Sequence, residues 1–148
     1  MESETFQPKL IEGGLHVDHR GIVAFVNDFD FAQVNRSYAI SFHRARELRG
    51  WIGHRQEQRW FWAVKGTVQI AVVKPDRWDV PASNLSVVRF VLSATKPQVL
   101  HIPAENAIGI VNFNADAILM VFTSGRIENA KLDDYRFSVD TWPILDIA

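Results

Sequence analysis

Residues 59–73 read RWFWAVKGTVQIAVV, in which two strongly apolar runs, 59–64 and 67–73, flank the dipeptide Lys65-Gly66. A glycine-containing pair between two apolar runs of this length is typical of a tight β-hairpin. Neither run has the apolar spacing of an amphipathic helix. The stretch therefore predicts two adjacent β-strands.

The same pattern extends through most of the chain, where short apolar runs alternate with turn residues such as Asn114-Ala115-Asp116. It predicts strands over 21–26, 36–42, 59–64, 67–73, 86–92, 98–102, 107–113 and 117–122. A single open sheet of this size would leave long apolar edges unpaired, so a closed or double-sheet all-β architecture is favoured. We expect a loop over 75–84, and a short helical turn over 129–135 with Asp133 and Asp134 exposed to solvent.

Length and composition indicate one domain over 1–148, with an N-terminal arm over 1–14 and a C-terminal tail over 126–148. Sixteen Lys and Arg residues against seventeen Asp and Glu give a net charge of −1 over 148 residues, which argues against nucleic acid as a partner. The segment 43–59 is locally basic and suits a small anion.

The chain has no cysteine, which excludes disulfide scaffolds, thiolate metal sites and thiol nucleophiles, and fits a cytoplasmic protein. The longest apolar runs, such as 117–122, are too short to cross a bilayer, and the N-terminal sequence is too polar for a secretory signal. We therefore expect no membrane association.

Two segments resemble the paired motifs of the cupin superfamily in their spacing. The first cupin motif, His-x-His followed by Glu and Gly, aligns with Ile52, His54, Arg59 and Gly66, and the second motif, Pro-His-Asn, aligns with Pro103, Ile108 and Asn112. The resemblance implies a cupin-type double-stranded β-helix, or jelly roll.

Three of the four cupin metal-ligand positions are occupied here by residues that do not bind metals in this setting, namely Ile52, Arg59 and Ile108. One imidazole beside a guanidinium and two aliphatic side chains does not supply the three or four donors that a divalent ion needs. The sequence predicts no metal and no cofactor, and argues against a metal-dependent dioxygenase. An arginine in place of the ligand Glu favours an anion.

Further motifs resemble the dTDP-sugar branch of the cupins, which comprises dTDP-4-dehydrorhamnose 3,5-epimerases and dTDP-4-keto-6-deoxyhexose 3,4-ketoisomerases (WxcM-like). They run over 19–21 (HRG), 36–38 (RSY), 49–54 (RGWIGH), 58–61 (QRWF), 101–104 (HIPA) and 134–137 (DYRF), and cover about residues 15–142. The resemblance implies a metal-independent isomerase or epimerase of a nucleotide-linked 4-keto-6-deoxy sugar in surface-polysaccharide biosynthesis.

The resemblance also implies roles for particular residues. In the epimerases a His, a Tyr and a second His lie where this chain has Ile52, Met120 and Ile108, so the epimerase mechanism of that family is not available here. The ketoisomerase pattern leaves His54 as base, Tyr38 as acid and Arg59 as stabiliser of the enediolate. Arg36 and Arg49 are expected to hold the diphosphate, and Trp51 and Asn112 to contact the substrate.

Other interpretations of these residues remain open. His54 is alternatively a hydrogen-bonded core histidine, and Arg59 alternatively pairs with Glu57 or Glu105 instead of a ligand. The aliphatic replacements also fit a non-catalytic cupin that binds a sugar nucleotide or another small anion. In either case we expect a homodimer that exchanges or pairs N-terminal strands.

Overall fold

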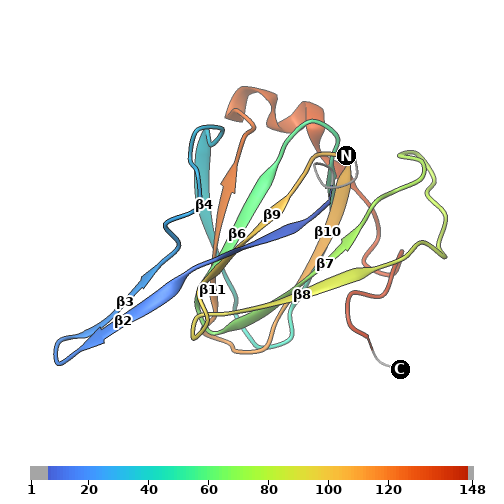
Figure 1. The fold of residues 1–148 in the computed structure, drawn as a ribbon. Helices are drawn as coiled ribbons and strands as arrows, with labels where there is room; N and C mark the ends of the chain where they lie inside the picture. The colour runs from blue at the N-terminus through green and yellow to red at the C-terminus, as the bar shows by residue number, and fades with distance from the viewer. Residues whose placement is uncertain (1–6, 147–148) are drawn as a thin grey trace.

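Residues 7–146 are described by a computed structural model, in which two five-stranded antiparallel sheets face each other (Figure 1). The first sheet has the order β1 (Lys9–Glu12), β9 (Gln98–Ile102), β6 (Arg59–Lys65), β11 (Ile118–Thr123) and β4 (Arg36–Ser41). The second has the order β12 (Tyr135–Arg136), β5 (Leu48–His54), β10 (Asn106–Asn112), β7 (Thr67–Val73) and β8 (Val88–Ser93). The predicted double-sheet architecture is confirmed.

Alternating side chains from both sheets fill the space between them, as strand periodicity requires. This interior core includes Phe61, Leu119 and Val121 from the first sheet and Ile70 and Ile108 from the second, all nearly inaccessible to solvent. Residues with these neighbours as cross-strand partners therefore point into the sandwich. The same cross-strand pairing shows which polar side chains point into the sandwich.

Each of the eight expected segments contains a strand, and a turn with Gly66 at φ 73° joins β6 to β7. The sequence analysis missed four strands: β1, β5, β12 and β2 (Gly14–Asp18), the last paired with β3 (Gly21–Phe25). β5 lacks an apolar run because Gly50, Gly53 and charged residues interrupt it. The first six residues of the expected N-terminal arm and the last two of the tail lie outside the described residues.

The outer face of the second sheet is covered by the C-terminal segment. Trp142 and Ile144 pack there against Trp51, Ala71 and Val111, and both tryptophans are fully buried. The Trp51 Nε1–H donates to the carbonyl of Trp142 at 3.0 Å. The expected tail is thus, over its described residues, largely a packing element of the sandwich.

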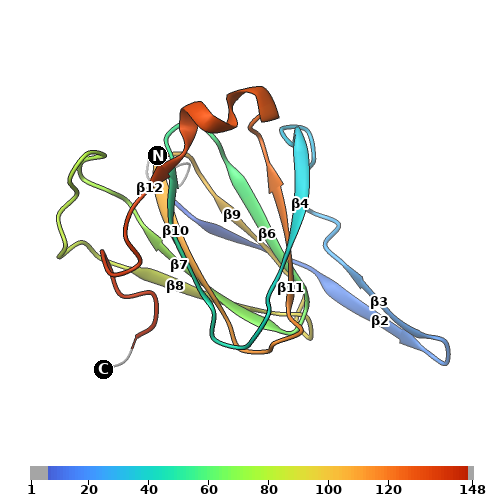
Figure 2. The ribbon, with the colours of Figure 1, turned by 180° about the vertical axis from the view of Figure 1, so that it is seen from behind.

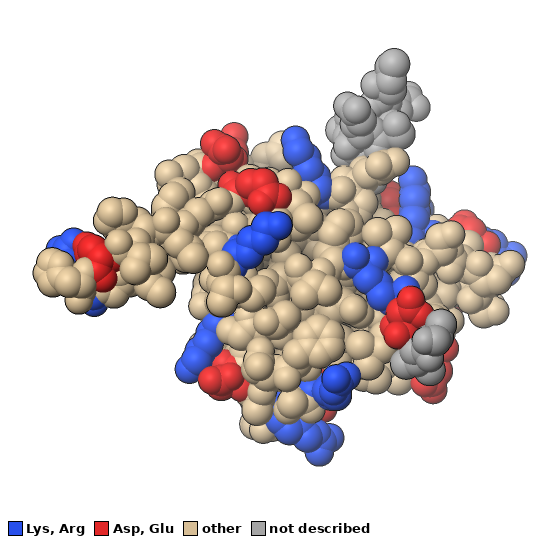
Figure 3. Space-filling model, turned by 60° about the horizontal axis from the view of Figure 1, so that its bottom comes forward, with Lys and Arg blue, Asp and Glu red and all other residues tan. Residues whose placement is uncertain are grey.

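The β2–β3 hairpin projects away from the sandwich as a two-stranded ribbon (Figures 1 and 2). In the space-filling view this projection carries its charged groups toward its tip (Figure 3). Along its length Leu15, Val17, Ile22 and Val23 are 41–65% exposed. An isolated two-stranded ribbon with exposed apolar side chains has little intrinsic stability in water.

The 3-10 helix η1 (Ile127–Asp133) crosses the end of the sandwich between β11 and β12 (Figures 1 and 2). The expected helical turn overlaps this helix, but the expected exposure of Asp133 is wrong, since that residue is 8% exposed. Its carboxylate is drawn inward by hydrogen bonds to the segment that follows β5. Over the described residues, no helix is long and apolar enough to span a bilayer.

Candidate active site

Polar side chains from four strands converge at the end of the sandwich under η1. On β4 and β11, Arg36 pairs with Thr123 and Tyr38 with the core residue Val121. On β6, Arg59 pairs with Thr123 and with Ile102, which is also a core residue. Arg36, Tyr38, Arg59 and Thr123 therefore all face the interior.

The second sheet contributes β5 to the same space. Ile52 is the cross-strand partner of Ile108, and His54, two residues further on, points to the same side. A register shift in the β5–β10 pairing makes Arg49 the partner of the core residue Ile110. Arg49, Ile52 and His54 consequently share the inner face with the residues of the first sheet.

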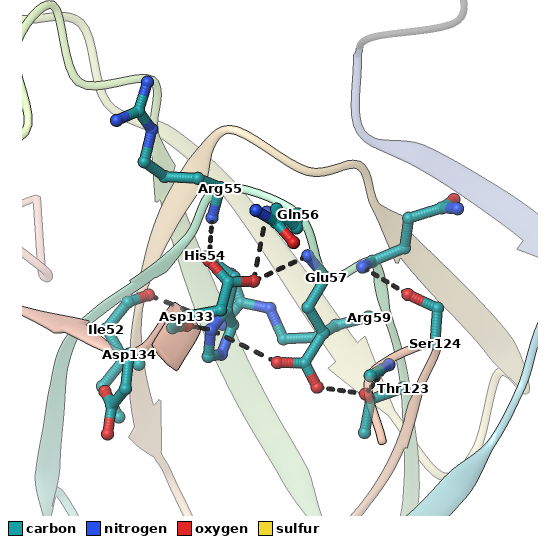
Figure 4. A network of polar contacts seen from close by, with 12 residues as sticks. Ile52, His54, Arg55, Gln56, Glu57, Arg59, Thr123, Ser124, Asp133 and Asp134 are labelled. Atoms are coloured by element: carbon teal, nitrogen blue, oxygen red, sulfur yellow. Dashed lines mark hydrogen bonds and ion pairs between the residues drawn. The ribbon is translucent and has the colours of Figure 1, made fainter. Parts of the chain in front are cut away.

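The imidazole of His54 is held through its Nδ1 atom. Nδ1 contacts the backbone carbonyl of Asp133, and the Oε2 atom of Glu57 lies 3.3 Å away (Figure 4). Because a carbonyl oxygen only accepts hydrogen bonds, Nδ1 must carry the proton in this contact. In the neutral ring Nε2 is then the unprotonated nitrogen, as a general base requires.

The surroundings of His54 favour this neutral form. Burial lowers the pKa of His54 below the usual 6.5, and the positive charge of Arg59 lowers it further. Asp133 and Glu57 oppose the shift without reversing it. His54 is therefore a neutral base at pH 7.

Arg59 is a buried cation with incomplete hydrogen bonding. Its side chain is 3% exposed and donates to the carbonyl of Asn106 at 3.2 Å and of Ile52 at 3.5 Å. Its Nε–H has no partner in the described structure. Burial lowers the pKa of Arg59 to about 10, which still leaves the guanidinium charged at pH 7. An unpaired donor beside a buried positive charge is suited to binding an oxyanion.

Tyr38 and Arg36 form the β4 side of the site. The guanidinium of Arg36 lies 5.4 Å from the ring centre of Tyr38 and 3.4 Å from Glu57 Oε1. Loss of hydration raises the pKa of the Tyr38 phenol above its usual 10, so the hydroxyl stays protonated at pH 7. Tyr38 remains 39% exposed, which leaves it accessible as a proton donor to a ligand.

The expected site residues divide into two groups. Arg36, Tyr38, Arg49, His54 and Arg59 share the inner face, as set out above. Trp51 points to the opposite face of β5 and lies fully buried under the C-terminal segment. Asn112 is fully buried near the other end of β10, where its side chain hydrogen-bonds to the backbone of Arg44, Glu47 and Asn114.

The comparison of Met120 with the epimerase tyrosine needs correction. Met120 pairs with Trp62, which packs in the outer cluster around Phe29 and Trp60. Met120 therefore faces away from the interior, and the inward positions of β11 are Leu119, Val121 and Thr123.

Sequence reasoning missed two acidic residues of the site. Glu57 was considered only as a partner of Arg59, but it contacts His54, Arg36 and the hydroxyl of Thr123. Asp133 contacts the segment that carries Glu57 although it lies far along the chain (Figure 4). The separation of Glu57 from His54 by three residues was the one local signal for the first; no local signal exists for the second.

A cavity of about 430 Å³ lies beside this network, between η1 and the segment that follows β5. Glu57, Asp133, Ser124 and Arg126 are among its lining residues, whereas His54, Tyr38 and Arg59 are not. The cavity therefore reaches the acidic side of the His54–Glu57 pair.

Potential metal ligands also meet here, since one ligand atom each of His54, Glu57 and Asp133 lies within 4.8 Å of the others. The donor groups of all three residues already have other contacts. The Asp133 carboxylate accepts three backbone N–H bonds, the Glu57 carboxylate contacts Thr123 and Arg36, and Nδ1 of His54 carries a proton. Nearby Arg59 adds a positive charge that disfavours a cation. This donor set does not fit a metal ion.

Two facing antiparallel sheets, with Tyr38, His54 and Arg59 on their inner wall, define a jelly-roll protein with a polar end. Solved cupin-type enzymes share this fold. QdtA, a sugar 3,4-ketoisomerase from Thermoanaerobacterium thermosaccharolyticum solved with TDP, superposes with a TM-score of 0.68 at 19% identity, covering 90% of both chains. A dTDP-4-dehydrorhamnose 3,5-epimerase from Bacillus anthracis, with TDP and PPi bound, has a TM-score of 0.73 at 16% identity, covering 94% of this chain and 86% of that one.

A 3,4-ketoisomerase from Helicobacter canadensis has a TM-score of 0.68 at 16% identity and covers 89% of this chain and 92% of its own. The expected cupin-type jelly roll is confirmed. A family model described as "FdtA: WxcM-like, C-terminal" matches residues 7–141. The chain belongs to this family, as its motifs implied. None of the curated proteins searched matches it.

Proposed function

We propose that the protein is a metal-independent isomerase of a nucleotide-linked, dTDP-type 4-keto-6-deoxy sugar, with 3,4-ketoisomerisation as its reaction. The observation that carries the proposal is the state of His54, a neutral imidazole with Nδ1 protonated and Nε2 unprotonated, on the same inner face as Tyr38 and Arg59. The ligands named for the solved relatives, TDP among them, support this substrate class.

The reaction needs one base, one acid and one cation. His54 Nε2 takes the proton from C3, and the C–H electrons form the C3=C4 bond as the C4 carbonyl becomes an enediolate oxygen. Arg59 stabilises that negative charge, and Tyr38 donates its proton to the oxygen. The 3-hydroxyl then returns a proton to Tyr38 as C3=O forms, and His54-H⁺ protonates C4.

The substrate diphosphate is assigned to Arg36 from the first sheet and Arg49 from the second, both of which face the interior. The guanidinium of Arg36 lies 5.4 Å from the ring centre of Tyr38, close to the reacting end. Guanidinium groups bind phosphate oxygens through charge-assisted hydrogen bonds. Trp51 and Asn112 are left out of the binding site because their surfaces are fully buried.

We assign the projecting β2–β3 hairpin to a homodimer contact. Val17 and Ile22 are cross-strand partners, 64% and 65% exposed, and form an apolar surface on the ribbon. A second copy covering this surface would remove it from water and support the ribbon. The absence of cysteine and the nucleotide-sugar substrate fit a cytoplasmic place for the reaction, in surface-polysaccharide biosynthesis.

A second candidate function is the binding of a sugar nucleotide without turnover. The cross-strand pair Ile52 and Ile108 favours it, because both residues occupy positions that carry histidines in the epimerases and neither can transfer a proton. The two functions differ in what happens to a 4-keto-6-deoxy sugar nucleotide once it is bound.

The substitution His54→Ala separates the two functions. If the protein is an isomerase, turnover falls by about 10²–10⁴-fold, which is the usual contribution of a general base, while dTDP affinity stays nearly unchanged. His43→Ala is the matched control, since His43 is exposed in the loop after β4. A wild-type protein that binds dTDP-4-keto-6-deoxyglucose but never converts it would favour the binding function.

A further inference from the structure

Asp133, the last residue of η1, is bound to the segment that links β5 to β6. Its carboxylate accepts backbone N–H bonds from Arg55 at 2.7 Å, Gln56 at 3.1 Å and Glu57 at 2.8 Å. Three N–H donors on one buried carboxylate fix the path of this segment. The side chain of Glu57 is positioned as a result.

The backbone of Asp133 also holds the imidazole of His54. The carbonyl of Asp133 accepts a hydrogen bond from the Nδ1–H of His54, while Glu57 Oε2 lies 3.3 Å from the same nitrogen (Figure 4). Both groups that contact Nδ1 thus depend on the placement of one residue, which lies in a different part of the chain. A shift of η1 would release the carbonyl and Glu57 together.

We propose that Asp133 is a positioning residue that holds His54 in the Nδ1–H tautomer, with Nε2 unprotonated and directed at the substrate. The inference rests on the proposed function for its catalytic consequence, but not for its structural one. Asp133 does not touch the reacting atoms in this proposal. It acts through the carbonyl bond to His54 and through the three N–H bonds that place Glu57.

The neighbouring residue provides a matched control. Asp134 has the same side chain and directs it at the exposed guanidinium of Arg136, whose Nε lies 3.1 Å from Oδ1. A general effect of removing negative charge near the site would appear in both Asp133→Asn and Asp134→Asn. An effect of position would appear in the first alone.

The kinetic test compares Asp133→Asn, Asp133→Ala and Asp134→Asn in turnover of dTDP-4-keto-6-deoxyglucose. We expect kcat to fall about 100-fold in Asp133→Ala, the cost of displacing a catalytic group by about 1 Å, with KM changed less than about threefold. The nearly isosteric Asp133→Asn keeps one acceptor oxygen and should fall less. Asp134→Asn should match the wild type. Equal kcat values for wild type and Asp133→Ala would overturn the proposal.

A second readout does not depend on activity, and its wild-type arm does not depend on whether a variant folds. Two-dimensional ¹H–¹⁵N correlation of the imidazoles, with His54 assigned by its absence in His54→Ala, reports which ring nitrogen carries the proton. The wild type should show the Nδ1–H tautomer, and folded Asp133→Asn a mixture with Nε2–H. An Nε2–H tautomer in the wild type refutes the positioning role. If the expected tautomers appear without turnover, positioning stands and the isomerase function fails.

Discussion

The interior of the sandwich has two ends that differ sharply within the same strands. On β6, Phe61 and Ala63 are buried in the apolar core, while Arg59 brings a charge to the same inner face. On β11, Leu119 and Val121 give way to Thr123 in the same manner. Positions only two residues apart on one strand therefore differ in their free energy of burial. Burial of the apolar side chain is favourable, whereas burial of the polar or charged side chain is costly.

The two ends of the interior are stabilised in different ways. The apolar end needs only close packing, whereas the polar end needs a partner for each buried charge. The network of Glu57, Asp133 and backbone groups supplies most of these partners, but Nε of Arg36 and of Arg59 has none in the described structure. These two unsatisfied donors are where an anionic ligand would add the missing acceptors.

The largest effect should come from a substitution that removes a core side chain from the apolar end. Leu119→Ala removes a fully buried side chain from the interior core, and we expect a loss of about 2–5 kcal/mol in the free energy of unfolding. Turnover per folded molecule should change little. Urea unfolding followed by tryptophan fluorescence measures the loss, and an unchanged midpoint would mean that this end does not carry the stability assigned to it.

The second-largest effect should come from the polar end, where we expect a loss of turnover instead of a loss of stability. Arg59→Met replaces the buried cation with an apolar side chain of similar length, so that turnover falls about 10²–10³-fold through loss of oxyanion stabilisation. Steady-state kinetics measure the fall, alongside circular dichroism to verify the fold. Arg136→Met, at an exposed arginine, is the control. Wild-type turnover in Arg59→Met would rule out the oxyanion role.

These contrasts also explain what the sequence predicted. Short apolar runs located β6, β7, β10 and β11 because most residues of these strands are buried or half-buried. β5 was not predicted, because its glycines and charged residues leave no apolar pattern. The cupin motif aligned both His54 and Arg59 with ligand positions, and both face the interior, from β5 and from β6.

Other features depend on contacts that no local pattern encodes. Trp51 looked available for a ligand because nothing nearby indicates that the segment around Trp142 covers it. The sequence does not show which face of β11 Met120 lies on, because that depends on the pairing of β11 with β6 and β4. Asp133 looked like a solvated acid because its partners lie about eighty residues earlier in the chain.

A smaller effect is expected at the rim of the polar end. Arg49→Ala should weaken binding of dTDP by about 1.5–3 kcal/mol, the range for a hydrogen bond to a charged group. Arg44→Ala serves as the control, because Arg44 is exposed and pairs with Glu47 in the loop before β5. Isothermal titration calorimetry distinguishes them. Equal dissociation constants for Arg49→Ala and wild type would remove Arg49 from the binding site.

The smallest effect should be in the pH dependence of the polar end. Burial lowers the pKa of His54, so the neutral base persists in the folded protein below pH 6.5. The acid limb of kcat/KM should therefore lie below 6.5.

Stability should follow the same sign. The unfolded chain takes up the His54 proton more readily than the folded protein, so the stabilising contribution of neutral His54 is complete above pH 6.5 and is lost as the pH falls. Arg59, Glu57 and Asp133 all act on this group, so His54→Asn is the control that isolates its share. A stability profile in His54→Asn that matches the wild type through this range would contradict the shift.

The central claim is that one base, His54, removes the sugar proton from C3 and not from C5. The most direct test incubates the protein with dTDP-4-keto-6-deoxyglucose in D₂O and follows the C3 and C5 protons by NMR. We predict loss of the C3 proton signal or appearance of a 3-keto species, with the C5 signal retained. Broadened ligand signals without any exchange would contradict the claim and indicate a binding protein, and exchange at C5 would contradict the single base.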